Sequence, residues 1–145
     1  MKYTNKQIVD IMGFLGTMGE KKLPSKISYA IMRNLVIFKR EYDVYENALN
    51  KLMNDYKEYI VRDDNENPVL FSNGIPKMSD SMVSEFEKEL IELLSIEVNI
   101  SPFYVQESIF EYDDLHSHYD ALSASDIFSL IDIMCEKPKD DTNDK

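Results

Sequence analysis

The chain is poor in several residue types on which particular functions depend. It has one cysteine, Cys135, so no disulfide can form within the chain, and a reducing compartment fits this. Its four glycines are spaced neither as a P-loop nor as a dinucleotide-binding fingerprint. No apolar run approaches the roughly 18 residues of a membrane span, and the N-terminal segment lacks the pattern of a signal peptide. We therefore expect a soluble, cytoplasmic protein.

Basic residues are scarce in the second half of the chain. The net charge is −11, yet residues 1–60 carry 10 Lys/Arg against 7 Asp/Glu, whereas residues 61–145 carry 6 against 20. Such a surplus of carboxylates repels the phosphates of naked nucleic acid, so we expect no direct nucleic-acid binding. The same surplus suits a protein partner with a basic surface, and mimicry of a nucleic acid stays open.

One long helix is the clearest structural signal. Pro24 suits a helix start, and neither glycine nor further proline occurs up to about Tyr59. A helix over about 24–59 would be about 52 Å long, which exceeds the ~38 Å diameter of a compact domain of this size. Apolar residues recur along it at alternating steps of four and three, and we call this set the heptad stripe: Ile31, Leu35, Phe38, Tyr42, Tyr45, Leu49, Leu52 and Tyr56.

Three of the eight heptad-stripe residues are tyrosines, whose hydroxyl groups need a partner or water. We therefore favour packing of the stripe against other parts of the same chain. Self-association of two copies through the long helix is the alternative.

Shorter helices are expected on both sides of the long one. Thr4 can cap a first helix that ends near Gly16, and Ser79 can cap a helix in the stretch that follows it. A last helix is expected to start near Ser123 or Ser125, and Asp126, three residues after Ser123, makes an imperfect capping box with it.

Short strands are expected at 59–61 and 69–71, around a polar turn, at 96–100, and within 103–110. The predicted fold class is thus α+β and mainly helical, with two or three shorter helices and three or four short strands. We expect residues 1–136 to form one globular domain and residues 137–145 a disordered acidic tail.

The only two histidines stand in the stretch DDLHSHYD. His116 and His118, with Asp113, Asp114 and Asp120, have the residue types of a metal site. Side chains two positions apart point the same way only on a strand, and this stretch is too polar to be typical of one. We interpret it as a surface loop, and we predict no metal and no cofactor.

A second stretch has some residues of a calcium-binding loop. Asp63, Asn65 and Asn67 match its first, third and fifth positions. However, Pro68 stands where the loop needs a glycine, and Gly74 where it needs a glutamate. We interpret the stretch as a hairpin turn rich in Asn and Asp.

Acidic side chains are the main candidates for contact with a partner. Glu85, Glu89 and Glu92 fall on the outer side of the helix expected after Ser79. Such a run is often only a solvated helix face. We nevertheless expect these three glutamates, with Asp113 and Asp114, to contact a basic partner, and we predict no catalytic residue.

The stretch LPSKISYAIMRNL, residues 23–35, resembles a block in small uncharacterised proteins of bacteriophages that infect Gram-positive bacteria. The likeness continues at Tyr45-Glu46, at 63–69, at 89–100 and in the closing stretch 122–134. That family carries no assigned activity, so the resemblance implies a phage or prophage context, with the host cytoplasm as location, but no catalytic residue. Small acidic phage proteins often act by binding, including as inhibitors of host defence.

Three functions stay open on the sequence. We favour a non-enzymatic phage or prophage accessory protein that binds a host or phage protein through an acidic surface, as an anti-CRISPR-like inhibitor of host defence does. The first alternative is an oligomeric structural or assembly factor of a phage, built on the long helix. The second is a small metal-dependent enzyme built on His116 and His118.

Overall fold

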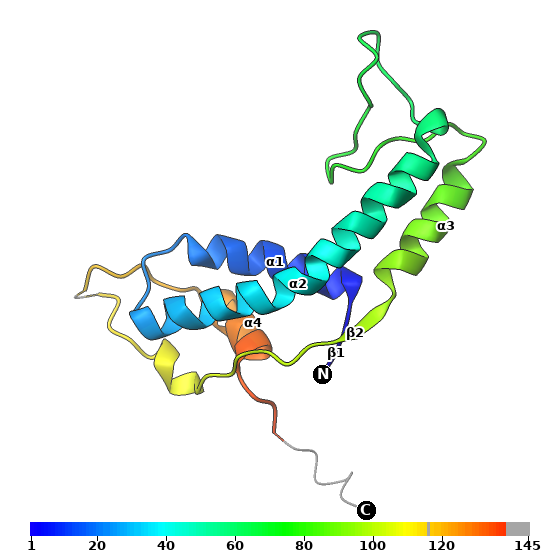
Figure 1. Ribbon diagram of the computed structural model, residues 1–145. Coiled ribbons are helices and arrows are strands. Elements are labelled where there is room, and N and C mark those ends of the chain that lie inside the picture. The colour runs from blue at the N-terminus through cyan, green and yellow to red at the C-terminus, as the bar shows by residue number, and fades with distance from the viewer. Residues whose placement is uncertain (116, 139–145) are drawn as a thin grey trace, which may run out of the picture.

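The chain forms a globular body and a projecting arm that share one long helix (Figure 1). The computed structural model describes residues 1–115 and 117–138. Within them the fold is α+β and mainly helical, as predicted, with four α-helices and a two-stranded antiparallel sheet. The end of the predicted acidic tail, residues 139–145, lies outside the described residues.

Helix α2, Ser25–Asp55, is the predicted long helix, and at 1.5 Å per residue its 31 residues span about 46 Å. Pro24 occupies the cap position just before it. The helix ends four residues earlier than expected, and a 3-10 turn, η1, follows at Lys57–Tyr59. The N-terminal half of α2 lies in the body and its C-terminal half lies in the arm (Figure 1).

The heptad stripe faces the rest of the chain along the whole of α2. Ile31, Phe38 and Tyr45 are buried, and the other five residues of the stripe are half-buried. Ile31 and Phe38 belong to the core of the body, where Leu35 and Tyr42 also pack. In the arm the ring of Tyr56, just after the helix, meets the ring of Phe86 edge-on, with 5.4 Å between ring centroids.

Helix α1, Asn5–Gly19, lies beside the N-terminal half of α2 (Figure 1). Thr4 caps it as predicted, and the capping box is complete because Gln7 accepts a hydrogen bond from the Thr4 N–H at 2.8 Å. The helix continues to Gly19, three residues beyond the expected end. Gly13 and Gly16 stay helical, since the apolar face that includes Leu15 is fully buried and outweighs their low helix propensity.

Helix α4, Ala124–Met134, and the 3-10 helix η2, Glu107–Phe110, complete the body. Ser123 caps α4, and the capping box with Asp126, predicted to be imperfect, is complete. Leu130 and Met134 are wholly buried against the core that α1 and α2 build.

A polar residue, Asn34, is also wholly buried in the body. Its side-chain Oδ1 accepts from the Phe103 N–H at 2.8 Å, and its Nδ2 donates to the Phe103 carbonyl at 2.9 Å. Nδ2 also donates to the Ala30 carbonyl at 2.9 Å. Each buried polar atom of this side chain is therefore satisfied, and the segment around Phe103 is fixed to α2.

The sheet pairs the N-terminal residues with the segment that follows the arm. Strand β1, Lys2–Thr4, pairs antiparallel with β2, Glu97–Asn99, with Tyr3 opposite Val98. Strand β2 was predicted from its alternating pattern, whereas β1 was not. Asn5, directly after β1, donates from Nδ2 to the Leu93 carbonyl at 2.9 Å and so ties the start of α1 to the end of the arm.

Three of the predicted strands are wrong. Residues 59–61 and 69–71 take part only in isolated bridges, Ile60 with Met78 and Leu70 with Pro76, and a third bridge joins Arg62 with Pro68. Each bridge joins a different pair of segments and covers one residue pair, so no regular strand forms. Residues 103–110 are an extended stretch followed by η2, because the Phe103 backbone pairs with the Asn34 side chain instead of with a strand.

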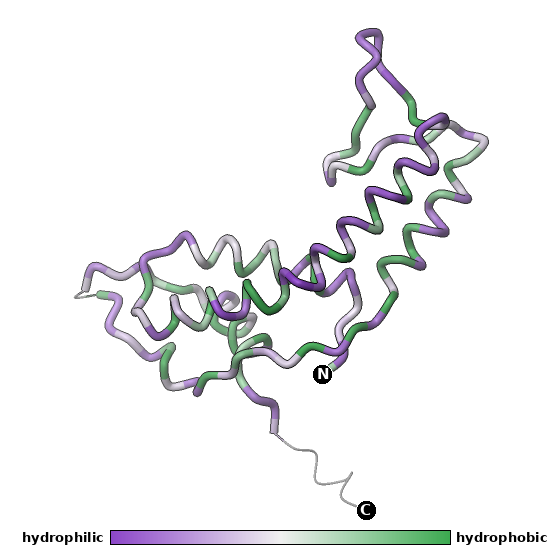
Figure 2. The backbone as a smooth tube through the Cα atoms, viewed as in Figure 1, coloured by the Kyte–Doolittle hydropathy of each residue, from purple (hydrophilic) through white to green (hydrophobic). Residues whose placement is uncertain are grey.

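The arm consists of the C-terminal half of α2, the segment 56–82 and helix α3, Val83–Leu94. Ser79 does not cap α3 with its side chain, which contradicts our prediction, and Met82 stands at the cap position. The predicted turn at 63–67 is present, since Asp63 Oδ1 accepts from the N–H groups of Asn65 and Asn67. Figure 2 shows that the tip of this segment is hydrophilic and that the apolar residues of α3 line its side toward α2.

Candidate protein-interaction surface

The five acidic residues expected to contact a partner lie in two separate places. Glu85, Glu89 and Glu92 are exposed on α3, in the arm. Asp113 and Asp114 are exposed in the loop after η2, at the other end of the molecule (Figure 1). The structure therefore does not bring the two groups together into one surface.

Two of the glutamates border a groove between α2 and α3, which we call the acidic groove. It has a volume of about 390 Å³ and is lined by Ala48, Lys51, Leu52, Asp55, Glu89, Glu92, Leu93 and Ile96. Leu52 and Leu93 are half-buried and form an apolar floor. Three carboxylates stand around this floor against one ammonium group, so the groove carries a negative charge.

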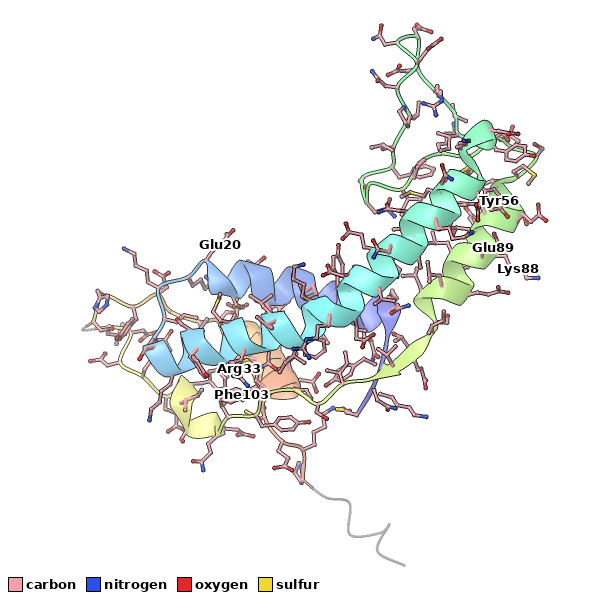
Figure 3. All side chains as sticks on the ribbon, in the orientation of Figure 1. Glu20, Arg33, Tyr56, Lys88, Glu89 and Phe103 are labelled. Atoms are coloured by element: carbon pink, nitrogen blue, oxygen red, sulfur yellow. The ribbon has the colours of Figure 1, made fainter. Side chains whose placement is uncertain are left out.

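The side chains of Tyr56 and Glu89 come together at the end of the acidic groove (Figure 3). The pKa of Tyr56 is raised to about 12, chiefly by a hydrogen bond to the Glu89 carboxylate and next by partial loss of hydration. The negative charges of Glu89, Glu85 and Asp55 make smaller contributions to the same rise. Carboxylates from both α2 and α3 thus lie close to this hydroxyl group.

The one basic side chain in the acidic groove is held by an acidic neighbour. Lys51 Nζ lies 2.8 Å from Asp55 Oδ2, and both side chains are more than half exposed. The hydrogen bond to Asp55 and the charges of Asp55 and Glu89 raise the pKa of Lys51. Lys51 and Asp55 thus offset each other's charge, and Glu89 and Glu92 leave the acidic groove with a net negative charge.

Large apolar side chains stand exposed beside these acids. Ile91 on α3 is 63% exposed, and Ile96, at the end of the acidic groove, is 51% exposed. A surface with both carboxylates and accessible apolar groups is suited to a protein partner, because burial of the apolar groups adds to the charge attraction.

The loop with the histidines is tied to the body by Asp120. Asp120 Oδ2 accepts from the Lys22 N–H at 2.8 Å, and its carbonyl accepts from the Tyr112 hydroxyl. His118 is exposed and lies beside Tyr119, with ring centroids 4.3 Å apart, whereas His116 lies outside the described residues. In the described part of the chain, no group of three His, Cys, Asp or Glu side chains is placed to hold a metal ion.

Cys135 is buried at the end of α4 and is 5% exposed. Loss of hydration, and then the negative charge of Glu107, raise the pKa of its thiol. Both effects favour the thiol over the reactive thiolate.

The sequence interpretation missed the part of the acidic groove that comes from α2. Asp55 and Lys51 were not singled out, nor was Tyr56 as a partner of Glu89. The sequence held one indication of their role. Lys51, Asp55 and Tyr56 are close in sequence to Leu52, a residue of the heptad stripe that was expected to pack against another part of the chain. Which helix would cover that end of the stripe could not be told from local pattern.

No protein-family model, no curated protein and no solved structure matches the chain. Among the described helices, none combines the length and the apolar character that crossing a membrane requires.

Proposed function

We propose that the protein is a non-enzymatic binding protein whose acidic groove takes a basic region of another protein. The observation that supports this most is the meeting of Asp55, Glu89 and Glu92 around the apolar floor of Leu52 and Leu93, in an arm that projects from the body. A lysine or arginine side chain can place its charged end among the carboxylates and its methylene groups on this floor.

The resemblance of residues 23–35 to phage proteins supports a host or phage protein as the partner. In this proposal the protein is a phage or prophage accessory factor that works in the host cytoplasm. Basic surfaces that bind nucleic acid are common in host defence nucleases, and an acidic groove would compete with nucleic acid for such a surface. Inhibition of a host defence system is the activity that we propose for it.

Affinity capture from host cells, with the wild-type chain and charge variants as bait, tests this function. The double variant Glu89→Lys/Glu92→Lys reverses two charges of the acidic groove. We expect the wild type to retain a partner at modest salt, and the double variant to retain it at least about tenfold less, since reversed charges repel a basic surface.

The matched control is Glu20→Lys/Glu111→Lys, which changes the net charge by the same amount on exposed sites of the body. Glu20 lies at the far end of α1 from the arm (Figure 3). We expect this control to retain the partner as the wild type does. Equal retention by all three baits, or loss in the control alone, would contradict a function of the acidic groove.

A further inference from the structure

A second exposed face, with the opposite charge, runs along the N-terminal half of α2. Tyr29, Met32 and Val36 follow one another at steps of three and four, so they lie on one side of the helix, away from the heptad stripe. They are 55%, 58% and 57% exposed. Three large apolar groups in a row on the solvent side of a helix are not accounted for by the packing of the body.

Two arginines flank these apolar groups. Arg33 and Arg40 are seven residues apart, so their side chains leave the same side of α2, about 10 Å apart along the helix axis. Within the described residues no carboxylate lies at ion-pair distance from either guanidinium, whereas Lys39 and Lys51 on the same helix both have an aspartate partner. Residues 21–40 contain six Lys/Arg and no Asp or Glu, in a chain of net charge −11.

Arg33 is held in place by aromatic rings. Its guanidinium lies 5.3 Å from the ring centroid of Phe103 and 5.9 Å from that of Tyr29. These two rings meet edge-on at 5.7 Å, and the Phe103 backbone is fixed by Asn34. Figure 3 shows Arg33 and Phe103 together on one side of the body. A positioned guanidinium loses little conformational entropy on binding a carboxylate.

The surface around these side chains is hollowed. One groove of about 500 Å³ extends from Tyr29 past Val36 to Arg40. A second, of about 320 Å³, lies between Tyr29, Phe103 and Ile109. The two lie on either side of Tyr29, which lines both, and their linings are apolar and basic. We call them together the basic groove.

We propose that the basic groove binds an acidic amphipathic segment of another protein. Two carboxylates of that segment, about two helical turns apart, pair with Arg33 and Arg40, and its apolar side chains cover Met32 and Val36. The charge of the groove selects this occupant. A second copy of the chain would bring the same arginines face to face, since a twofold interface uses one patch on both subunits. A nucleic acid could place phosphates on the arginines but would leave Met32 and Val36 uncovered.

Binding of a labelled synthetic helical peptide of about 16 residues tests the proposal. The peptide carries leucines along one face and two glutamates seven positions apart, and its control has lysines in place of the glutamates. Fluorescence anisotropy gives the affinity, and backbone amide shifts in NMR locate the site. We expect the glutamate peptide to bind the wild type, to shift the amides of 29–40, and to bind at least about tenfold tighter than the lysine peptide.

The variants are Arg33→Glu/Arg40→Glu and the milder Arg33→Gln/Arg40→Gln, which serves if the first does not fold. The matched control is Lys57→Glu/Lys88→Glu, which changes the charge equally in the arm, where Lys88 points away from the body (Figure 3). We expect the control to bind like the wild type and the glutamine variant to bind at least about fivefold more weakly.

Equal binding of the two peptides, or unchanged binding by the glutamine variant, would overturn the proposal. Two other results would replace it with a different occupant. One is a single-stranded oligonucleotide that shifts the amides of 29–40 where the peptide does not. The other is a dimer of the wild type that the arginine variants convert to a monomer.

Discussion

The side-chain amide of Asn34 pairs with both the N–H and the carbonyl of Phe103, 69 residues further along the chain. This pairing has the geometry of two neighbouring backbone groups in a sheet, although one partner is a side chain on a helix. It connects the core of the body to the basic groove, because the ring of Phe103 holds Arg33.

Replacement of Asn34 by alanine is expected to lower the free energy of unfolding by about 2–4 kcal/mol, because the partly buried N–H and carbonyl of Phe103 lose their partners. Urea unfolding measures this. Asn50→Ala is the matched control, since Asn50 is exposed on the same helix, and its effect should stay within about 0.5 kcal/mol. One ordinary hydrogen bond contributes about 1 kcal/mol. A decrease in the free energy of unfolding smaller than this for Asn34→Ala would show that the pairing does not stabilise the fold.

Phe38 is wholly buried where α2 crosses the sheet, and its ring meets that of Tyr3 edge-on, with centroids 5.2 Å apart. Phe38→Ala leaves a cavity in the core and should lower the free energy of unfolding by about 3–5 kcal/mol. Val44→Ala, on the same helix but 64% exposed, should change it by no more than about 0.5 kcal/mol. Similar effects of the two substitutions, in chemical unfolding, would mean that the heptad stripe does not face the core.

Tyr3 makes the free energy of unfolding depend on pH in the alkaline range. Burial, and then the charges of Tyr104 and Asp132, raise its pKa from 10.0 to about 12 in the folded state. Below pH 10 its hydroxyl is protonated in both states, and its contribution is constant. Between about pH 10 and 12 the unfolded chain loses this proton while the folded chain keeps it, so the free energy of unfolding falls.

Tyr3→Phe retains the ring and removes the titration. The fall in the free energy of unfolding above pH 10 should therefore become shallower by up to about 1.4 kcal/mol per pH unit. Part of the fall remains, because the pKa values of Tyr42, Tyr45, Tyr56 and Tyr112 are also raised. Urea unfolding at several pH values gives both slopes, and identical slopes would contradict the assignment to Tyr3.

The elements that the sequence predicted are those with local causes. Thr4 and Ser123 cap their helices through residues three positions away, and the heptad stripe follows from helical spacing alone. Glu85, Glu89 and Glu92 could be placed on the outer side of α3 for the same reason. These features need no knowledge of distant parts of the chain.

The features that escaped prediction depend on distant partners. Strand β1 has three residues and forms because β2, about 95 positions away, offers its edge. Asn34 has the spacing of a core residue, but its polarity gave no reason to bury it before Phe103 was known to lie against it. In the same way, the sequence could not show that Asp55 joins Glu89 and Glu92, or that Asp113 and Asp114 lie elsewhere.

The dissociation constant of the captured partner tests the role of the acidic groove most directly. Isothermal titration calorimetry should give an affinity for the wild type that falls at least about tenfold between low salt and 0.3 M NaCl, and a loss of similar size in Glu89→Lys/Glu92→Lys at low salt. The same affinity for this variant as for the wild type, at low salt, would contradict the account.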